Sequence, residues 1–399
     1  MSNKNKKISE GAYGCIFKPG YQCNGKVIES DKYITKIQRK AKTSNKEADI
    51  SAIIRKINHY EDFFSPIVEE PCPIDLATVE DDEIKKCGFI GKDKETSYES
   101  NKIKYVGKRT LSEQMAYLFH KKPLHIFKYL FESHIHLIDG FKKLYSAGII
   151  HFDVKENNIV CRPKTSIPII IDFGLSIDIS KIAEENYHYS FFTYGPDYGP
   201  WCIDIAFLTY MANKLGEGWQ EITVDQKNLL LVISDFFAKN DAILSLLSKD
   251  EQMEFRTRIS NDFTNRFINT KSTWKQIADY LVGFTGTWDN YAVCVIFLYI
   301  IKDMQLESYV ETFPKLNEYI QLLKSILLAS PDQRLDLDKT KEAMSKFNSM
   351  NRKEKRNLNR AVLEKSKTED YNKQIYNRVM NTKIENLKNE KKIYDALRL

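Results

Sequence analysis

The most constraining feature of this 399-residue chain is a polar loop between apolar runs, with the sequence HFDVKENNI at 151–159. A helical pattern ends just before it near Gly148, and a second short motif, IIDFG, follows at 170–174. Asp153, Asn158 and Asp172 thereby place two carboxylates and an amide close to one another along the chain. Phosphoryl transfer requires a carboxylate that orients the attacking hydroxyl and oxygen ligands for magnesium, and the two motifs supply such groups.

An Asp, a Lys two residues later, an Asn five residues later and a following Asp-Phe-Gly form a known pattern. In this order the residues resemble the eukaryotic-type serine/threonine protein kinases. The resemblance implies that Asp153 is the catalytic base and that Lys155 neutralises the γ-phosphate of ATP. It implies further that Asn158 and Asp172 hold Mg²⁺ through oxygen atoms, the ligands this cation prefers.

The N-terminal segment predicts a phosphate-covering turn. Gly11 and Gly14 lie between strand-like residues, so that the backbone can approach phosphate oxygens without a Cβ in the way. In the kinase pattern Ser9 occupies the place of the first glycine, and Ile16 occupies the place of the residue that covers the adenine. An ordinary hairpin turn is the alternative interpretation of the same residues.

Two further residues of the small lobe fit the kinase pattern. Lys36 lies on one face of an alternating strand pattern at 32–37 and corresponds to the lysine that contacts the α- and β-phosphates. Glu47, on an amphipathic helix with Ser44 as a candidate N-cap, is its expected partner, with a surface ion pair as the alternative. Backbone groups from Tyr105 to Gly107, at the end of the last strand, are expected to bind adenine.

In the larger C-terminal part, helical spacing predicts a helix over 124–145, in which His134 and His136 are expected to be structural or surface residues rather than metal ligands. The kinase pattern implies an activation segment from Asp172 to Asp204, with Asp204 paired to a distant Arg334. It also implies that Asp289 supports the loop at 151–159 from a central helix. These matches leave residues 205–286 as an apolar, helical insertion.

The residue before Asp153 is Phe152, where many kinases have an arginine that binds a phosphorylated activation segment. We therefore expect activity that does not depend on such phosphorylation. The Trp-centred sequence at 198–204 resembles kinase-like proteins of large DNA viruses, so we interpret the chain as a divergent kinase of that kind.

The positive charge of the chain is concentrated in its C-terminal tail. Residues 348–399 carry 14 Lys and Arg against 7 Asp and Glu, a net charge of +7, which leaves −1 for the rest of the chain. We expect this tail to be a helix docked on the body, with contact to an acidic or nucleic-acid partner as the alternative.

Seven cysteines without a C-x-x-C pair indicate a reducing compartment, with a chance pairing of Cys72 with Cys87 left open. A polar N-terminus and short apolar runs predict no signal peptide and no membrane association, and hence a cytoplasmic protein, in a host cell or virion if it is viral.

Together these features predict an α+β protein with a two-lobed, kinase-like fold. Residues 1–107 form a small antiparallel-sheet lobe, 108–347 a larger helical lobe with the insertion at about 205–286, and 348–399 a basic helical tail. The expected activity is ATP- and Mg²⁺-dependent phosphorylation of protein serine and threonine. A catalytically weak kinase-like scaffold that binds nucleotide and protein partners is the alternative, and a small-molecule phosphotransferase of related fold is a second one.

Overall fold

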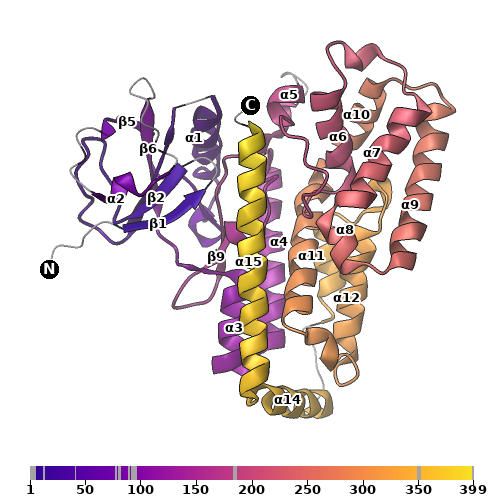
Figure 1. The fold of residues 1–399 in the computed structure, drawn as a ribbon. Coiled ribbons are helices and arrows are strands. Elements are labelled where there is room, and N and C mark those ends of the chain that lie inside the picture. Colours follow the sequence, from indigo (N-terminus) through magenta and orange to yellow (C-terminus); the bar gives the residue numbers. More distant parts are fainter. Residues whose placement is uncertain are drawn as a thin grey trace. The chain divides into compact units, whose positions relative to one another are not determined.

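The computed structural model describes residues 6–11, 14–40, 42–76, 79, 82–88, 90, 97–182, 187–347 and 352–397. The chain divides into two compact units, whose elements are labelled in Figure 1. The sheet unit comprises residues 1–111, 157–176 and 382–399, and the helical unit comprises 112–156 and 177–381. The protein is thus of mixed α+β class, with a small, mainly antiparallel sheet region and a larger helical region.

The sheet unit is built around a five-stranded antiparallel sheet of order β1-β2-β3-β6-β5. Its strands are β1 (Lys6–Gly11), β2 (Gly14–Lys18), β3 (Tyr33–Arg39), β5 (Cys72–Ile74) and β6 (Tyr98–Lys104). Helix α1 (Lys42–Ile54) follows β3 and buries Ile50 and Ile54, as their helical spacing predicts. The helix begins two residues before Ser44, so the prediction of Ser44 as its N-cap is wrong.

A second sheet of order β4-β10-β9-β7 completes the sheet unit. It contains β4 (Phe64–Ser65), β7 (Arg109–Thr110), β9 (Ile159–Cys161) and β10 (Pro168–Ile171). Because β9 pairs with β7 and β10 pairs with β4, residues 157–176 group with the N-terminal strands. The sequence interpretation assigned them to the larger lobe, since strand pairing over such separations leaves no local signal.

Two disulfides lie within the sheet unit. Cys15 is bonded to Cys87, with their Cα atoms 6.1 Å apart, and Cys23 is bonded to Cys72, with a Cα separation of 5.7 Å. The bonds join β2 and the following loop to the long connection that contains β5 and α2 (Asp82–Lys85). This differs from the expectation of a reducing compartment, and the one pairing left open, Cys72 with Cys87, is not formed. The partners are 49 and 72 residues apart in sequence, so spacing gave no sign of them.

The helical unit contains the predicted long helix and the helices predicted for residues 205–286. Helix α4 (Ile126–Ser146) agrees with the predicted range 124–145 except that it begins two residues later and ends one residue later. It packs against α11 (Trp288–Asp303), a helix buried over nearly its whole surface. Residues 205–286 form helices that pack on this core, as predicted. The helices of this stretch are α6 (Ile203–Lys214), α7 (Gln226–Lys239), α8 (Asp241–Leu246), α9 (Lys249–Phe263) and α10 (Trp274–Val282). The remaining elements are α3 (Leu111–Lys121), β8 (Ile149–Ile150), β11 (Ile177–Asp178), α5 (Tyr187–Ser190), α12 (Pro314–Leu327) and α13 (Leu337–Met344).

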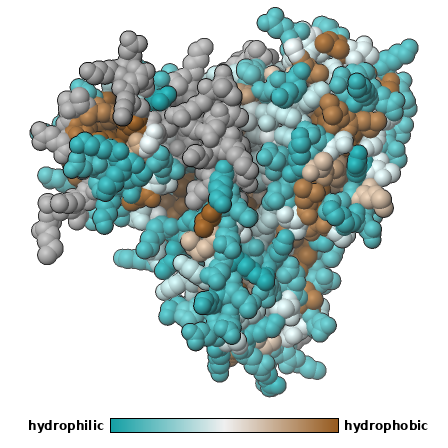
Figure 2. All heavy atoms as spheres, in the orientation of Figure 1, coloured by the Kyte–Doolittle hydropathy of each residue, from teal (hydrophilic) through white to brown (hydrophobic). Residues whose placement is uncertain are grey.

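The C-terminal tail forms two helices, α14 (Arg352–Ser366) and α15 (Glu369–Leu397). Ile375 and Val379 of α15 are buried, and Tyr371 packs on Phe119 of α3 with 5.7 Å between ring centroids. The predicted docking of a tail helix is thereby confirmed. Figure 2 shows a mainly hydrophilic surface over α14, as expected from its Lys and Arg content.

Within the described ranges, no single helix is long and apolar enough to cross a bilayer. Only α10 combined with the stretch 285–303 reaches that length and hydropathy, and the two are bent by 50°.

Candidate functional site

The predicted phosphate-covering residues lie on the β1–β2 hairpin. Gly11 pairs with Gly14, and Ser9 pairs with Ile16, across the two strands. The tip residues 12 and 13 lie outside the described ranges. Gly14 has no room for a side chain, because a Cβ there would lie 2.2 Å from the carbonyl oxygen of Ile37. A glycine is therefore required by the close approach of β3.

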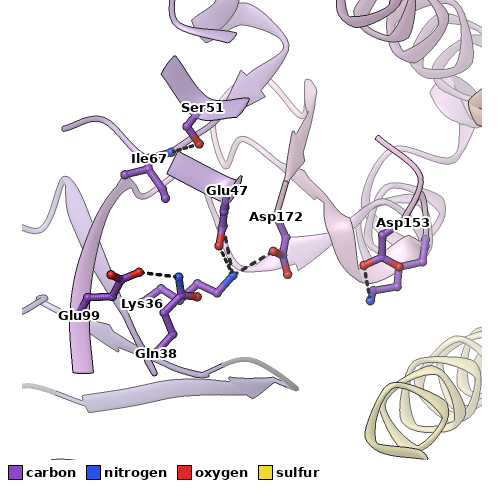
Figure 3. Close-up of polar contacts among 9 residues, drawn as sticks. Lys36, Gln38, Glu47, Ser51, Ile67, Glu99, Asp153 and Asp172 are labelled. Atoms are coloured by element: carbon purple, nitrogen blue, oxygen red, sulfur yellow. Dashed lines mark hydrogen bonds and ion pairs between the residues drawn. The ribbon is translucent and has the colours of Figure 1, made fainter. Parts of the chain in front are cut away.

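Lys36 lies between two carboxylates in the interior of the sheet unit (Figure 3). Its Nζ is 3.0 and 3.2 Å from the two carboxylate oxygens of Glu47 on α1, and 3.1 Å from Oδ1 of Asp172. The predicted pairing of Lys36 with Glu47 is confirmed. Asp172 follows β10, so the second sheet brings this residue, 136 positions away in sequence, to the ammonium group.

The charge of Lys36 is stabilised by these partners. Burial by itself would lower the pKa of the Lys36 ammonium, but the carboxylates of Asp172 and Glu47 outweigh burial and hold that pKa above its ordinary value. The lysine is therefore positively charged throughout the physiological pH range. Of the three side chains, that of Asp172 is the most exposed, at about one-third, whereas Lys36 and Glu47 are almost completely enclosed.

Asp172 and Asn158 occupy the same end of a strand pair. In the β9–β10 register Ile159 lies opposite Ile170, so Asn158 and Asp172 both lie just beyond the last paired residues. Asp172 has a φ of 62°, a conformation that costs energy for a residue other than glycine and is typical of functional sites.

These two oxygen-bearing side chains fit a magnesium ion, which proteins bind through one or two carboxylates together with substrate phosphates. Among the described residues no cluster of three or more His, Cys, Asp or Glu side chains forms a metal site.

The predicted adenine-binding segment follows β6. The backbone N–H of Tyr105 donates to the carbonyl of Lys32 at 2.8 Å, so it is not available to a ligand. The ammonium group of Lys18 lies 3.5 Å from the centre of the Tyr105 ring. At Gly107 a Cβ would lie 2.3 Å from the carbonyl oxygen of Cys161. The Tyr105 N–H is therefore removed from the groups predicted to bind adenine. The prediction keeps the Tyr105 carbonyl and the backbone of residues 106 and 107.

The sequence interpretation missed a second polar pair behind Lys36. Gln38 on β3 donates through Nε2 to Oε1 of Glu99 on β6 at 3.3 Å, and both side chains are buried. Figure 3 shows the pair beside the Lys36 cluster. The only signal in the sequence was a polar residue at alternate positions of β3, which is equally typical of a solvated strand face.

In the helical unit, both carboxylate oxygens of Asp153 accept hydrogen bonds. Lys155 Nζ lies 2.8 Å from Oδ2, and the hydroxyl of Tyr198 donates to Oδ1 at 2.9 Å. The pairing of Asp153 with Lys155 follows from their spacing along the loop. Tyr198 was not predicted, because its contact depends on the fold of a segment 45 residues downstream.

The loop that carries Asp153 is held from below by Asp289 of α11. The carboxylate of Asp289 accepts from the backbone N–H groups of His151 and Phe152 at 2.8 and 3.0 Å, as the sequence predicted. Burial raises the pKa of Asp289, although these N–H donors and His151 favour its charged form. Phe152 has a φ of 67°, and Trp201 fixes it by donating from its indole N–H to the Phe152 carbonyl at 2.9 Å.

The predicted pairing of Asp204 with Arg334 is also confirmed. Arg334 donates to both oxygens of Asp204, at 2.7 and 3.1 Å, and both side chains are buried. The indole N–H of Trp288 donates to the same carboxylate at 3.2 Å.

The predicted site residues therefore fall into two groups, each described within its own unit. The sheet unit holds Ser9, Gly11, Gly14, Ile16, Lys36, Glu47, Tyr105, Gly107, Asn158 and Asp172, and the helical unit holds Asp153 and Lys155. Comparison of the sequence with known proteins found no matching family model and no matching curated protein.

Proposed function

We propose that the chain is a serine/threonine protein kinase with a two-lobed, kinase-like fold, which transfers the γ-phosphoryl group of ATP to protein hydroxyls. The observation that carries the proposal is the contact of Lys36 with both Glu47 and Asp172. A lysine held by a helix glutamate beside the aspartate of an Asp-Phe-Gly motif is an arrangement suited to bind nucleotide phosphates.

In this proposal the sheet unit binds ATP. Lys36 contacts the α- and β-phosphates, and the glycines of the β1–β2 hairpin cover them. Asn158 and Asp172 would hold magnesium, which when bound neutralises charge on the phosphates. Adenine binds to the backbone that follows β6.

The helical unit supplies the residues that act on the acceptor. Asp153 accepts a hydrogen bond from the substrate hydroxyl and takes up its proton as the oxygen attacks the γ-phosphorus, while the bond from that phosphorus to the β,γ-bridging oxygen breaks and ADP leaves. In the proposal, Lys155, whose Nζ is 2.8 Å from Asp153, neutralises negative charge on the transferred group. Because each oxygen of Asp153 already accepts one hydrogen bond, the carboxylate is oriented before the substrate binds.

Transfer of radiolabelled phosphate from γ-labelled ATP to a generic protein substrate tests the proposal. We expect magnesium-dependent labelling of serine and threonine by the wild-type chain, and a loss of at least about a thousandfold with Asp153→Asn, which retains the shape of the side chain but not its basicity. Nucleotide binding without transfer by the wild-type chain would instead support the kinase-like scaffold. Labelling of a small molecule in place of protein would support the phosphotransferase.

The cytoplasmic location is part of the same proposal, and the two disulfides of the sheet unit bear on it. Disulfides are rare in reducing compartments, so a cytoplasmic chain should hold these cysteines as thiols or acquire the bonds elsewhere. Alkylation of intact cells before lysis, followed by mass spectrometry of the cysteine peptides, distinguishes the two states.

A further inference from the structure

Residues 187–201 of the expected activation segment are fastened to the inserted helices. Three hydrogen bonds join these residues to elements between α6 and α8. Asn213 donates to the Phe191 carbonyl at 2.7 Å, the Tyr194 hydroxyl donates to Asp235 at 2.8 Å, and the Asp241 N–H donates to the Asp197 carbonyl at 3.2 Å. The segment is thus held by groups that need no added phosphate.

Asn240, between α7 and α8, is the most buried of these groups. Its side chain is fully buried, and its Nδ2 donates to the carbonyls of Tyr198 and Trp201 at 3.0 and 3.2 Å. Its Oδ1 accepts from the N–H of Ile243 and so caps α8. The Asn240 amide therefore caps the N-terminus of α8 and also binds the end of the expected activation segment.

The residues that Asn240 holds are those that contact the loop at 151–159. The Tyr198 hydroxyl donates to Asp153, and the Tyr198 ring packs edge-on against Trp201 with 5.2 Å between centroids. Trp201 in turn donates to the Phe152 carbonyl and packs on the Phe152 ring at 5.0 Å. A continuous set of contacts thus links the insertion to the carboxylate of Asp153.

We propose that the insertion holds the activation segment in one conformation without phosphorylation, with Asn240 and Tyr198 as positioning residues for Asp153. We call the contacts of residues 187–201 with the insertion the latch. This inference rests on the proposed kinase function. The latch takes the place of the phosphate clamp that Phe152 cannot form, because a phenyl ring cannot bind a phosphorylated side chain. A small rotation of the Asp153 carboxylate misaligns the attacking hydroxyl, so loss of the Tyr198 donor slows the chemical step rather than ATP binding.

The first test is Tyr198→Phe, which removes one hydroxyl and retains the ring on Trp201. We expect kcat to fall about tenfold while the KM for ATP and the midpoint of thermal unfolding stay within error, as for an interaction made in the transition state. Unchanged kcat would overturn the positioning role. A rise in kcat would overturn it as well, since the hydroxyl would then block Asp153.

The second test is Asn240→Ser and Asn240→Thr. Both residues are uncharged and cap helices well but lack the amide donor, so α8 is retained and the latch is lost. We expect kcat to fall by at least about tenfold and amide hydrogen exchange in residues 187–201 to become at least about tenfold faster. Asn269→Ser, the same substitution at an exposed asparagine of the insertion, is the control and should alter neither.

The third test is treatment of the purified wild-type chain with a broad-specificity phosphatase, with mass spectrometry to verify that residues 176–204 carry no phosphate. Full activity is expected, and its loss would overturn the latch. If the wild-type chain transfers no phosphate at all, the proposed function and the role of Tyr198 are both wrong. Hydrogen exchange of the Asn240 variants would in that case still decide whether the insertion holds the segment.

Discussion

Arg334 binds Asp204 through two hydrogen bonds across 130 residues of sequence, with both side chains fully enclosed. The pair joins the start of α6 to the loop that precedes α13. Arg334 also donates to Thr287 at 3.0 Å, next to α11, so the guanidinium group connects three elements of the helical unit.

Removal of the Arg334 side chain should therefore lower the stability of the helical unit. Arg334→Met leaves the Asp204 carboxylate buried without its cation, and we expect a loss of about 3–5 kcal/mol in the free energy of unfolding. All four tryptophans, at 201, 219, 274 and 288, lie in the helical unit, so tryptophan fluorescence in urea reports on this unit alone.

Lys339→Met is the matched control, because Lys339 forms an exposed ion pair with Asp336 at 3.7 Å in the same region. Exposed pairs contribute at most about 1 kcal/mol, so its effect should be small. Similar losses in the two variants would show that enclosure of the Arg334 pair is not the source of its stability.

Lys36 should determine nucleotide affinity. Lys36→Met leaves Glu47 and Asp172 as two facing carboxylates without a cation, and these would repel phosphate groups as well as each other. We expect the Kd for ATP, measured by titration calorimetry with magnesium present, to rise at least tenfold, roughly 1.4 kcal/mol or more. The exposed Lys26→Met should bind ATP like the wild type, and retained affinity in Lys36→Met would exclude Lys36 from the binding site.

The pairs Lys36–Glu47 and Asp204–Arg334 could be predicted because each member stands within a motif of recognisable order. Tyr198 and Asn240 could not, since a tyrosine and an asparagine in polar turns carry no local signal of what they contact. The same holds for residues 157–176, which belong to the sheet unit through pairings with β4 and β7. Contacts formed between segments distant in sequence were accessible only where a known pattern supplied the partner.

The disulfides give a prediction about the sheet unit. Peptide mapping without reductant should recover Cys15 linked to Cys87 and Cys23 linked to Cys72. The buried cysteines at 161, 202 and 294 should react with an alkylating agent only after unfolding. Burial raises the pKa of Cys202 to about 12 and also raises that of Cys294, so little reactive thiolate is present at neutral pH.

A double-mutant cycle of unfolding free energies tests whether the bond between Cys15 and Cys87 stabilises the sheet unit. Cys15→Ser and Cys87→Ser should each cost about 2–5 kcal/mol, measured by hydrogen exchange of the β6 amides, because each frees a 72-residue loop in the unfolded chain. The double variant should cost no more than either single one. Additive losses would contradict the pairing.

His134 should make the helical unit sensitive to acid. Its ring stacks on Phe297 at 4.2 Å between centroids, its Nδ1 lies 2.7 Å from the Tyr319 hydroxyl, and burial lowers its pKa from 6.5 to about 3. The unfolded chain therefore binds a proton below pH 6.5 that the folded chain does not, and stability is lost as pH falls from 6.5 toward 3. As pH falls from 7.5 to 5.5, this histidine should lower the free energy of unfolding by about 1.4 kcal/mol. This is the value for one additional proton bound by the unfolded chain over the one pH unit below the ordinary pKa of histidine. Urea titrations followed by tryptophan fluorescence at both pH values should show that His134→Gln loses this increment of pH dependence, while the exposed His120→Gln retains it. An unchanged pH dependence in His134→Gln would mean that the buried ring is protonated in the folded chain.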